Sequence, residues 1–520
     1  MEPAINSQQQ DAQVKTVAAV DIGSNSVRMA VAEVTPDGRV EVLEQLQRAA
    51  RLGQDTFRRG RVGRETMRAV VSILRDFRKR LDFYAVERVR AVATSAIREA
   101  ANEDALLDRI LIATGLDVEV IDPAEESRLA VSAVRQAVGA EVIGGGSALV
   151  ADVGGGSTLL TVLEGGEISL SQSLDLGSIR MQEALSTAGE PPGRAVEILA
   201  HRIAAVVTSV QSTLPLKRIK TFVAVGGDAR FAAKQVGEAA DSGDLYLIDQ
   251  AGFNELVDRC APHTAEELTK RYGLSFAGAE TLGPALLVYR ALMQATRAKR
   301  MIVSAVSMRD GLLLDLARTV TGGQDDALYK GVVHSGMAVA EKYKVDLGHA
   351  RNVASLALNL FDELQDEHGM SARHRLLLHV AALVHEVGAY VSTRAHHKHS
   401  YYLITNSEIF GLTRDEMLIV AHVARYHRRN PPRPTHVDYM NLPREKRVLV
   451  SKLAALLRVG DALDCDRAQQ VRRIRCAREG EELVISVPDV TDLTLERRAL
   501  ADKGDLFEDI YGMRVRVEEG

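Results

Sequence analysis

The sequence predicts an α/β protein with two similar halves, followed by a mainly α-helical module and a small β-containing tail. Three observations lead to this prediction. Strand and helix patterns alternate from Lys15 to about residue 315, which is typical of α/β layers. A series of strand, glycine turn, strand, hairpin and strand begins at Lys15 and restarts near Ser147. After "MIVSAVSMRDGLLLDL" the pattern becomes almost entirely helical up to Ala468.

The first half is predicted from the periodicity of its apolar residues. Many β-branched residues between Lys15 and Glu44 indicate three strands, joined by the turns "DIGSNS" and "PDG". "RETMRAVVSILRDFRKRLDFY" has apolar residues at helical spacing, whereas "RVRAVAT" and "DVEVI" indicate buried strands. "SAIREAANEDALLDRIL", between these two strands, predicts one continuous helix.

The second half repeats the pattern. "ALVADVGGGSTLLTVLEGGEISLSQSLDLG" predicts three strands followed by a helix, and "TFVAVGGDARFAAKQ" predicts a strand, a glycine pair and a helix. In the tail, "VRRIRCAREGEELVISVP" and "MRVRVEE" predict further strands. The expected organisation is a disordered tail over 1–14, the two halves over 15–130 and 131–315, the helical module over 316–468 and the small C-terminal α+β region over 469–520.

Composition restricts the classes of function. A chain of 520 residues is too long for one core, and 46% apolar with 26% charged residues is typical of a soluble globular protein. The net charge of -5 gives no overall attraction to nucleic acid or to an anionic membrane, so neither is expected as a partner. The sequence shows neither a signal peptide nor an apolar run of about 18 residues, which predicts a cytoplasmic protein. Cys260, Cys465 and Cys476 lack metal-type spacing and fit a reducing compartment.

The paired turns "DIGSNS" and "DVGGGST" predict a phosphate clamp. Glycine lets the backbone approach a ligand closely, consecutive amides form an anion-binding nest, and hydroxyl groups add donors. Asp21 and Asp152, which end the preceding strands, suit a hydrated Mg²⁺ or another divalent cation. The alternative is that each turn is a tight hairpin without a ligand. Candidate phosphate-binding residues, including those of the later "VGGD" element, are Gly23, Ser24, Asn25, Ser26, Gly154, Gly155, Gly156, Ser157, Thr158, Gly226 and Gly227.

These motifs resemble the two phosphate-binding hairpins of the actin, Hsp70 and sugar-kinase (ribonuclease H-like) superfold. In order and spacing, "AAVDIGSNSVRM", "ATSAIREAAN", "VIDPAEESRLAVSAV", "DVGGGST", "SLDLGSIRM" and "SMRDGLL" resemble the exopolyphosphatase and guanosine pentaphosphate phosphohydrolase (Ppx/GppA) family. "LLLHVAALVHEVGAYV" and "HHKHSYYLITNSE" extend the resemblance through the helical module of the family's long members. The resemblance implies two duplicated domains, a phosphoanhydride hydrolase and a homodimer.

The stretch "VIDPAEESRLAV" contains the candidate catalytic base. Asp122 is a favourable N-cap, Pro123 suits the first helical position, and Glu125 falls at N3, where it can close a capping box. This leaves Glu126 free, and the resemblance implies that it activates the attacking water. The resemblance also places Arg98 near the cleft, where it would neutralise the transferred phosphoryl group. The alternative for Arg98 is an ordinary position on a helix surface.

Two positions depart from the family pattern. Leu159 follows "GGGST" where the family usually has a glutamate, and Asp228 stands where threonine is common. Three consequences of Leu159 remain open: Mg²⁺ held more weakly or elsewhere, a replacement carboxylate, or a domain that binds its ligand but hydrolyses it slowly.

The helical module resembles an HD-type metal phosphohydrolase in the order of its candidate ligands. These are His349, the pair His385–Glu386 and Asp461. A glutamate at the position of the central aspartate disturbs the metal geometry, which favours a structural remnant over a catalytic metal.

Further histidines and arginines lie between these positions. We interpret the histidines as part of a loop that lines the substrate passage, and the arginines as a basic patch for a long polyanion or as a solvated surface. The residues are His396, His397, His399, Arg425, Arg428 and Arg429.

The predicted function is that of an exopolyphosphatase, which hydrolyses terminal phosphate from inorganic polyphosphate processively with Mg²⁺ or another divalent cation. The first alternative is the same chemistry on guanosine pentaphosphate. The second is a non-catalytic sensor of polyphosphate or guanosine penta- and tetraphosphate, suggested by Leu159 and Glu386. An ATP-dependent kinase of the same superfold is less favoured, because neither an adenine pocket nor a phospho-acceptor site is recognisable.

Overall fold

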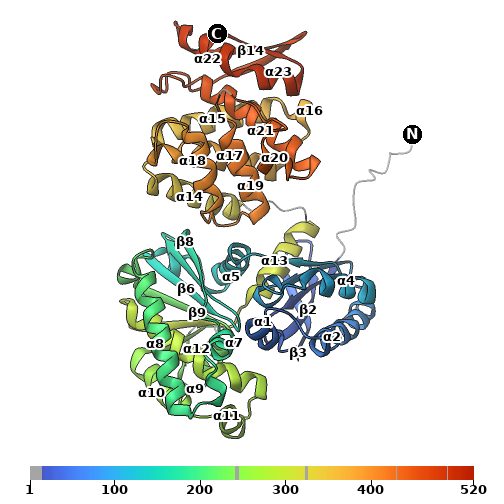
Figure 1. Ribbon diagram of the computed structural model, residues 1–520, viewed down its shortest axis with the longest axis vertical. Coiled ribbons are helices and arrows are strands. Elements are labelled where there is room, and N and C mark those ends of the chain that lie inside the picture. Colours follow the sequence, from blue (N-terminus) through green and yellow to red (C-terminus); the bar gives the residue numbers. More distant parts are fainter. Residues whose placement is uncertain (1–13, 241–244, 322–325, 429, 489) are drawn as a thin grey trace, which may run out of the picture. The chain divides into compact units, whose positions relative to one another are not determined.

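The structure is a computed structural model that describes residues 14–240, 245–321, 326–428, 430–488 and 490–520. The chain forms two compact units, which divide between residues 325 and 326 (Figure 1). Two predictions lie outside the described residues, namely the disordered tail apart from Val14, and the contribution of Arg429 to a basic patch. Within the described residues, no helix combines the length and the apolar character that crossing a bilayer requires.

The first sheet of the first unit has the strand order β3-β2-β1-β4-β5. The first three strands are antiparallel neighbours, while β4 and β5 continue the sheet in parallel. The strands are β1 (Lys15–Ile22), β2 (Ser26–Val34), β3 (Val40–Ala49), β4 (Arg88–Ala93) and β5 (Val118–Val120).

The second sheet repeats this order as β8-β7-β6-β9-β12, with the same parallel and antiparallel pairings, and β11 and β10 extend one edge. Each sheet has a register shift ten residues after its strand-ending aspartate, at Val31/Ala32 and at Val162/Leu163. The predicted duplication is therefore confirmed. The strands are β6 (Ser147–Val153), β7 (Thr158–Glu164), β8 (Glu167–Leu174), β9 (Thr221–Val225), β10 (Glu238–Ala239), β11 (Leu245–Asp249) and β12 (Arg300–Ser304).

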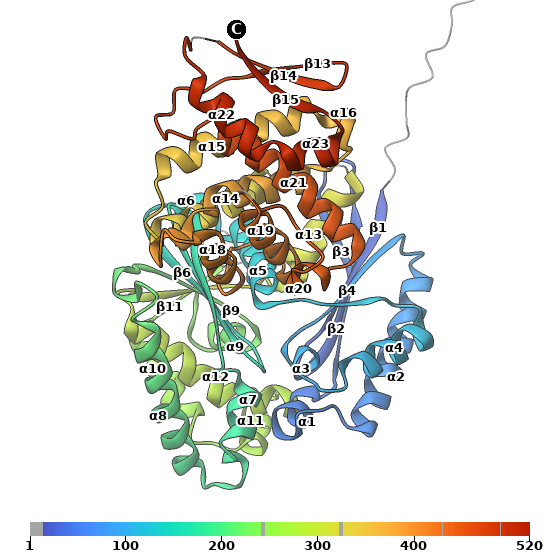
Figure 2. The same ribbon diagram turned by 45° about the horizontal axis from the view of Figure 1, so that its top comes forward.

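Helices cover the sheets of the first unit (Figure 2). They are α1 (Leu52–Arg59), α2 (Arg64–Phe83), α3 (Ser95–Arg98), α4 (Glu103–Thr114), α5 (Pro123–Val138), α6 (Ala140–Gly144), α7 (Ser178–Ala184), α8 (Pro192–Val210), α9 (Gly227–Val236), α10 (Gln250–Cys260), α11 (Ala265–Tyr272), α12 (Phe276–Ala295) and α13 (Met308–Thr321), with 3₁₀ turns η1 (Thr187–Gly189) and η2 (Leu216–Arg218).

The prediction of one continuous helix over "SAIREAANEDALLDRIL" is wrong. The chain breaks after α3 and begins α4 at Glu103. Asn102 exchanges two hydrogen bonds with the backbone of Val62, at 2.9 and 3.0 Å, and the Ala101 amide donates to the Gly60 carbonyl at 2.9 Å. These tertiary contacts hold the intervening residues to the loop before α2, which overrides the local helical pattern.

Strand β1 separates two apolar layers because its side chains alternate between the faces of the sheet. Ala18 and Val20 belong to the cluster that contains the buried residues of α2 and α4. Val17 and Ala19 belong to the cluster formed with α13 and with Leu129 of α5. Asp21 has the parity of Val17 and Ala19, so it lies on the face that α5 and α13 cover.

Helix α5 packs against α13, which itself packs on β1 and β2 of the first sheet, and against β7, β8 and β12 of the second sheet. Its N-terminus follows the prediction in part: the Asp122 side chain accepts from the Glu125 amide at 2.9 Å, and Pro123 occupies the first turn. Glu125 has a structural role, but through buried ion pairs with Arg128 at 2.6 Å and Arg90 at 2.9 Å.

The second unit is mainly helical, as predicted, with a small mixed tail. In the tail, β14 pairs antiparallel with β13 and parallel with β15, and two helices connect β14 to β15. The elements are α14 (Asp326–Lys342), α15 (Leu347–Glu363), α16 (Gln365–His368), α17 (Ala372–Val384), η3 (Val387–Tyr390), α18 (His396–Thr405), α19 (Arg414–Arg425), α20 (Val437–Met440), α21 (Arg444–Ala462), β13 (Arg475–Glu479), β14 (Glu482–Val487), α22 (Thr494–Lys503), α23 (Asp505–Tyr511) and β15 (Arg514–Glu519).

Candidate active site

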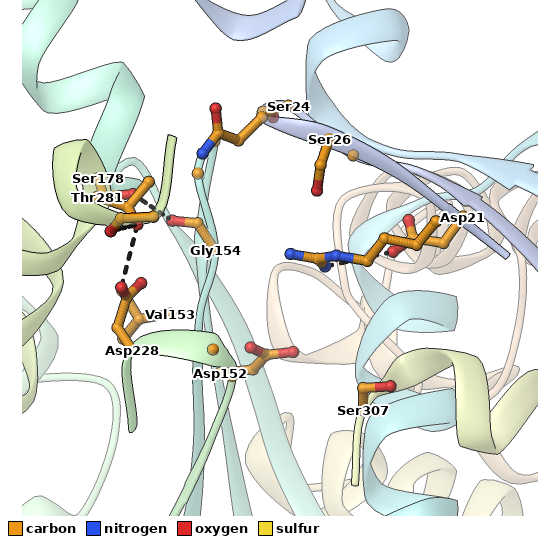
Figure 3. A pocket seen from close by; sticks show the side chains of 18 of the residues that line it. Asp21, Ser24, Ser26, Asp152, Val153, Gly154, Ser178, Asp228, Thr281 and Ser307 are labelled. Atoms are coloured by element: carbon orange, nitrogen blue, oxygen red, sulfur yellow. Dashed lines mark hydrogen bonds and ion pairs between the residues drawn. The ribbon is translucent and has the colours of Figure 1, made fainter. Parts of the chain in front are cut away.

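A polar pocket of about 270 Å³ lies in the first unit, and residues from both of its sheets line it (Figure 3). The ends of β1, β6 and β9 and the turns that follow them supply most of the lining. The predicted site residues that line it are Asp21, Gly23, Ser24, Asn25, Ser26, Glu126, Asp152, Gly154, Gly155, Gly156, Ser157, Gly226 and Gly227.

The two glycine turns have matching backbone geometry. The Gly23 amide donates to the Ser26 carbonyl at 3.0 Å, and the Gly154 amide donates to the Ser157 carbonyl at 2.9 Å. Carbonyl groups of each turn also accept hydrogen bonds from backbone amides at the start of a helix. The first turn bonds to the start of α1 and the second turn to the start of α7. Because the turn carbonyls point toward the helix, the turn amides are expected to point the other way, as they do in an anion-binding nest.

The second turn contacts the first domain directly. A Cβ on Gly156 would overlap the hydroxyl groups of Ser24 and Ser95, which themselves lie 3.1 Å apart. Arg180 of α7 donates to the Gly156 carbonyl at 2.5 Å and stacks over the Phe57 ring at 4.2 Å from its centroid. The glycine turns of the two halves are therefore in close contact beside the pocket that both of them line.

The third glycine element is fixed by Tyr289 of α12. Its hydroxyl donates to the Val225 carbonyl and accepts from the Val153 amide, so it joins the ends of β9 and β6. Gly226 has φ of 119°, a conformation that only glycine adopts without strain. A Cβ there would lie 3.4 Å from Asp152 Oδ1.

Two predicted site residues, Thr158 and Arg98, bond to other protein groups and are not among the described residues that line the pocket. The Thr158 hydroxyl donates to the Leu176 carbonyl at 2.9 Å, a buried structural bond. Arg98 donates to Glu126 Oε1 at 2.7 Å and to the Ile121 carbonyl at 2.5 Å, and it does not belong to the described residues that line the pocket. Arg98 is thus placed to orient Glu126.

Glu126 lies on the first turn of α5, where its side chain is buried against Arg98 and reaches the pocket. Burial is the main reason why the pKa of Glu126 rises to about 7; Arg98 acts in the opposite direction, and Asp152 and Asp21 raise it further. A carboxyl group with such a pKa can accept a proton near neutral pH and release it again.

Asp21 and Asp152 face the same pocket from matching strand ends (Figure 3). Asp21 is buried and Asp152 is half-buried, and the loss of hydration raises the pKa of each. Arg28 lies 3.6 Å from Asp21 and lowers the pKa of both carboxyl groups. Two carboxylates that line one polar pocket are a donor set that fits a hard divalent cation with water or phosphate oxygens as its other ligands.

Three arginines near the aspartates were not predicted from the sequence. Arg28 and Arg230 line the pocket, and Arg309 lies close enough to Asp21 and Arg28 to interact with both. Burial is the main cause that lowers the pKa of Arg230 and Arg309. The charge of Arg28 lowers both further, whereas Asp152 raises the pKa of Arg230 and Asp21 raises that of Arg309. Arg309 Nε is buried without a hydrogen-bond partner among the described residues. Arg28 and Arg309 stand inside motifs of the family resemblance, "VRM" and "SMRDG", and Arg230 follows the glycine pair in "GGDARF". These positions were the available signal.

The two departures from the family pattern lie on different sides of the site. Leu159 pairs with Asp152 across β6 and β7, so the two side chains share a face of the sheet. Asp228 lines the pocket but accepts from the Thr281 hydroxyl at 3.0 Å and points toward it (Figure 3). Burial is the main cause that raises the pKa of Asp228 to about 6.

In the second unit, the structure brings His349, His385, Glu386 and Asp461 together. His396 lies beside His427, a residue that the sequence analysis did not select. The prediction that His396, His397 and His399 belong to a loop is wrong, because all three lie on helix α18, where His397 and His399 are half-buried.

One arginine of the predicted basic patch is ion-paired: Arg425 lies 3.3 Å from Asp438. Arg428 accepts a hydrogen bond from Arg458 through its backbone carbonyl, which does not neutralise its side chain.

The duplicated α/β fold, with a polar pocket lined by two glycine turns, two aspartates and a buried glutamate, fits a hydrolase of the actin-like superfold. Residues 30–320 match the Ppx/GppA phosphatase family, and residues 334–505 match its domain III. This chain therefore belongs to the Ppx/GppA phosphatase family. The predicted family, fold class and hydrolase class are thereby confirmed.

Similar proteins carry the names of both activities of the family, the pyrophosphatase and the exopolyphosphatase. Proteins named guanosine-5'-triphosphate,3'-diphosphate pyrophosphatase from Vibrio vulnificus and Vibrio parahaemolyticus are 26% and 25% identical. The matches cover 79% and 90% of this chain and 80% and 91% of theirs. An exopolyphosphatase from Cytophaga hutchinsonii is 25% identical with a TM-score of 0.53, over 60% of this chain and all of its own.

Proposed function

We propose that the protein hydrolyses the terminal phosphoanhydride bond of inorganic polyphosphate and releases orthophosphate. The observation that carries this proposal is the pairing of two matched glycine turns around a pocket that also receives Glu126. The turns and Arg28 and Arg230 supply donors and positive charge for a phosphate chain, and no base or sugar is needed for these contacts.

In the proposed reaction, the Glu126 carboxylate accepts a proton from a water molecule that attacks the terminal phosphorus. The bond from that phosphorus to the bridging oxygen breaks, and the shortened chain leaves with the bridging oxygen. Arg28 and Arg230 balance the charge on the phosphoryl oxygens, while Arg98 orients the base. Asp21 and Asp152 would hold Mg²⁺, which would neutralise charge on the phosphate oxygens.

Guanosine pentaphosphate is a second candidate substrate, and one wall of the pocket favours it. Asp228, Thr281, Phe231 and Leu274 line this wall. A carboxylate there repels a bare polyanion but can accept hydrogen bonds from sugar hydroxyls, and Phe231 offers an apolar surface. The two relatives whose match covers 79% and 90% of this chain carry the pyrophosphatase name.

A substrate comparison tests this proposal. Phosphate release from long-chain polyphosphate and from guanosine pentaphosphate is measured with Mg²⁺ for the wild type and for Asp228→Ala. The proposal expects a higher kcat/KM for polyphosphate and no loss of it in the variant. A preference of at least about tenfold for the nucleotide, equivalent to about 1.4 kcal/mol, which Asp228→Ala reduces, would instead establish the second candidate.

The pH dependence of kcat/KM is expected to follow Glu126. The base works only as a carboxylate, so activity should rise with pH and reach half its limit near the pKa of Glu126, about 7. Arg98 lowers this pKa, so Arg98→Met should move the midpoint to higher pH. Initial rates across the pH range at saturating Mg²⁺ check this expectation. A wild-type midpoint that Arg98→Met leaves in place would contradict it.

Leu159→Glu is expected to lower the Mg²⁺ concentration needed for half-maximal activity by about tenfold, because metal affinity rises with the number of carboxylate ligands. The new carboxylate would share the face of Asp152. Leu159→Gln is the matched control, because it has the same size without the charge. Equal Mg²⁺ requirements in both variants would show that position 159 does not reach the metal.

A further inference from the structure

Six side chains of metal-binding residue types converge in the second unit from five separate places in the sequence. We name them the histidine–carboxylate cluster: His349 on α15, His385 and Glu386 after α17, His396 on α18, His427 after α19, and Asp461 on α21. All six are at most 9% exposed. They lie outside the unit that holds the glycine turns.

The histidine tautomers can be read from backbone carbonyls, because a carbonyl oxygen only accepts hydrogen bonds. His385 Nδ1 lies 2.7 Å from the Ala382 carbonyl, so Nδ1 carries the proton. The neutral ring then has its lone pair on Nε2. This atom is buried without a hydrogen-bond partner among the described residues. It lies 3.9 Å from Asp461 Oδ1, so it is directed at the cluster.

His396 and His427 present a second unsatisfied arrangement. Their Nδ1 atoms face the carbonyls of Thr393 and Ala424, at 3.3 and 2.5 Å, so both Nε2 atoms carry lone pairs in the neutral rings. These Nε2 atoms are 3.1 Å apart. Two lone pairs at this distance repel each other unless a cation or a shared proton joins them. Two nitrogens on one tetrahedral zinc ion are about 3.3 Å apart, given bond lengths of about 2.0–2.1 Å.

The first three members of the cluster are close enough to share one ion. Ligand atoms of His349, His385 and Glu386 all lie within 4.8 Å of one another. His349 Nδ1 contacts Asp464 at 2.7 Å, which leaves Nε2 toward the cluster at 3.5 Å from Asp461 Oδ1. A carboxylate on the outer nitrogen of an imidazole is the usual support of a metal-binding histidine. The His385 and His427 rings are in contact, with centroids 4.9 Å apart, so the two groups adjoin.

Each carboxylate of the cluster forms an ion pair with one basic side chain through one of its oxygens. Lys503 pairs with Asp461 Oδ2 and Arg467 with Glu386 Oε1, each at 2.5 Å. Asp461 Oδ1 continues to face the imidazoles. A set of four imidazoles and two carboxylates suits a divalent transition metal better than Mg²⁺, which prefers oxygen ligands.

We propose that the histidine–carboxylate cluster binds a divalent transition metal ion, separately from the Mg²⁺ expected at the glycine turns. The sequence alone favoured a structural remnant because Glu386 disturbs the expected aspartate position. The structure adds His396 and His427, which bring two further lone pairs to the centre.

The test uses the full-length protein, with any affinity tag removed, stripped of metal and then titrated with Zn²⁺. The wild type should retain at least about one equivalent of Zn²⁺ through gel filtration and gain thermal stability, because an ion that binds only the folded state stabilises it. His385→Ala should lose Zn²⁺, and Glu386→Gln should bind it at least about tenfold more weakly. His422→Leu is the control, because it removes a buried histidine of the same unit outside the cluster.

The Co²⁺ form supplies a second readout. The absorption bands of Co²⁺ should report nitrogen ligands in the wild type and change in His427→Gln, provided that circular dichroism shows both proteins folded. A folded wild type that retains no Zn²⁺ and shows no thermal shift overturns the proposal, and the close His396–His427 contact then reflects a shared proton. Equal Zn²⁺ retention in the wild type and a folded His385→Ala also overturns it.

Discussion

Glu126→Gln is expected to lower kcat for phosphate release from polyphosphate by at least about a hundredfold, the lower limit for the loss of a general base. The variant keeps the size of the side chain and can still bond to Arg98, but it cannot accept the proton of the attacking water. Polyphosphate affinity should change little, because the turns and arginines remain in place. Initial rates with Mg²⁺ and a separate binding titration measure the two quantities.

Glu125→Gln is the matched control for this prediction. Its carboxylate is paired with Arg128 and Arg90 and does not belong to the described residues that line the pocket. Losing that charge should cost about 1.5–3 kcal/mol of stability with kcat largely retained, because Asp315 still binds Arg128. If Glu126→Gln instead keeps full activity, the water is activated by another group.

Gly156→Ala should abolish most of the activity, with a loss of at least about a hundredfold in kcat/KM, because a misplaced phosphate contact is that costly. The new Cβ would overlap the Ser24 and Ser95 hydroxyls and lie 2.7 Å from Phe57. Relief requires the second glycine turn to move away from the first domain. Overpacking of this kind also lowers stability by about 1–3 kcal/mol, which thermal unfolding would detect.

Gly193→Ala is the control for a glycine substitution. A Cβ at Gly193, on the first turn of α8, meets nothing within 4 Å, so activity should be unchanged. If Gly156→Ala matches Gly193→Ala in activity, close contact of the two turns is not needed for hydrolysis.

The duplicated sheets could be predicted because each strand carries its own signal in β-branched residues and in the turn that follows. The break between α3 and α4 could not, because it depends on Asn102 bonding to Val62, forty residues away in the sequence. Local periodicity contains no information about such a contact.

The candidate site was predictable where chemistry resides in a local motif. The acid-plus-glycine turns and the Glu125–Glu126 pair are motifs of this kind. Arg28, Arg230 and Arg309 were missed because an arginine has the same local signature at a pocket as on a solvated surface. The ion pair of Arg98 with Glu126 also needed the fold, which brings Arg98 Nη1 to 2.7 Å from Glu126 Oε1.

The position of α5 couples the proposed chemistry to the geometry of the cleft. Its first turn is held to the first domain through Arg98, which binds both Glu126 and the Ile121 carbonyl. Its body packs on β7 and β8 of the second domain. Separation of the two domains must therefore strain or break one of these attachments. If Glu126 is the base proposed here, the same two attachments that hold the halves together also keep it in place beside the glycine turns.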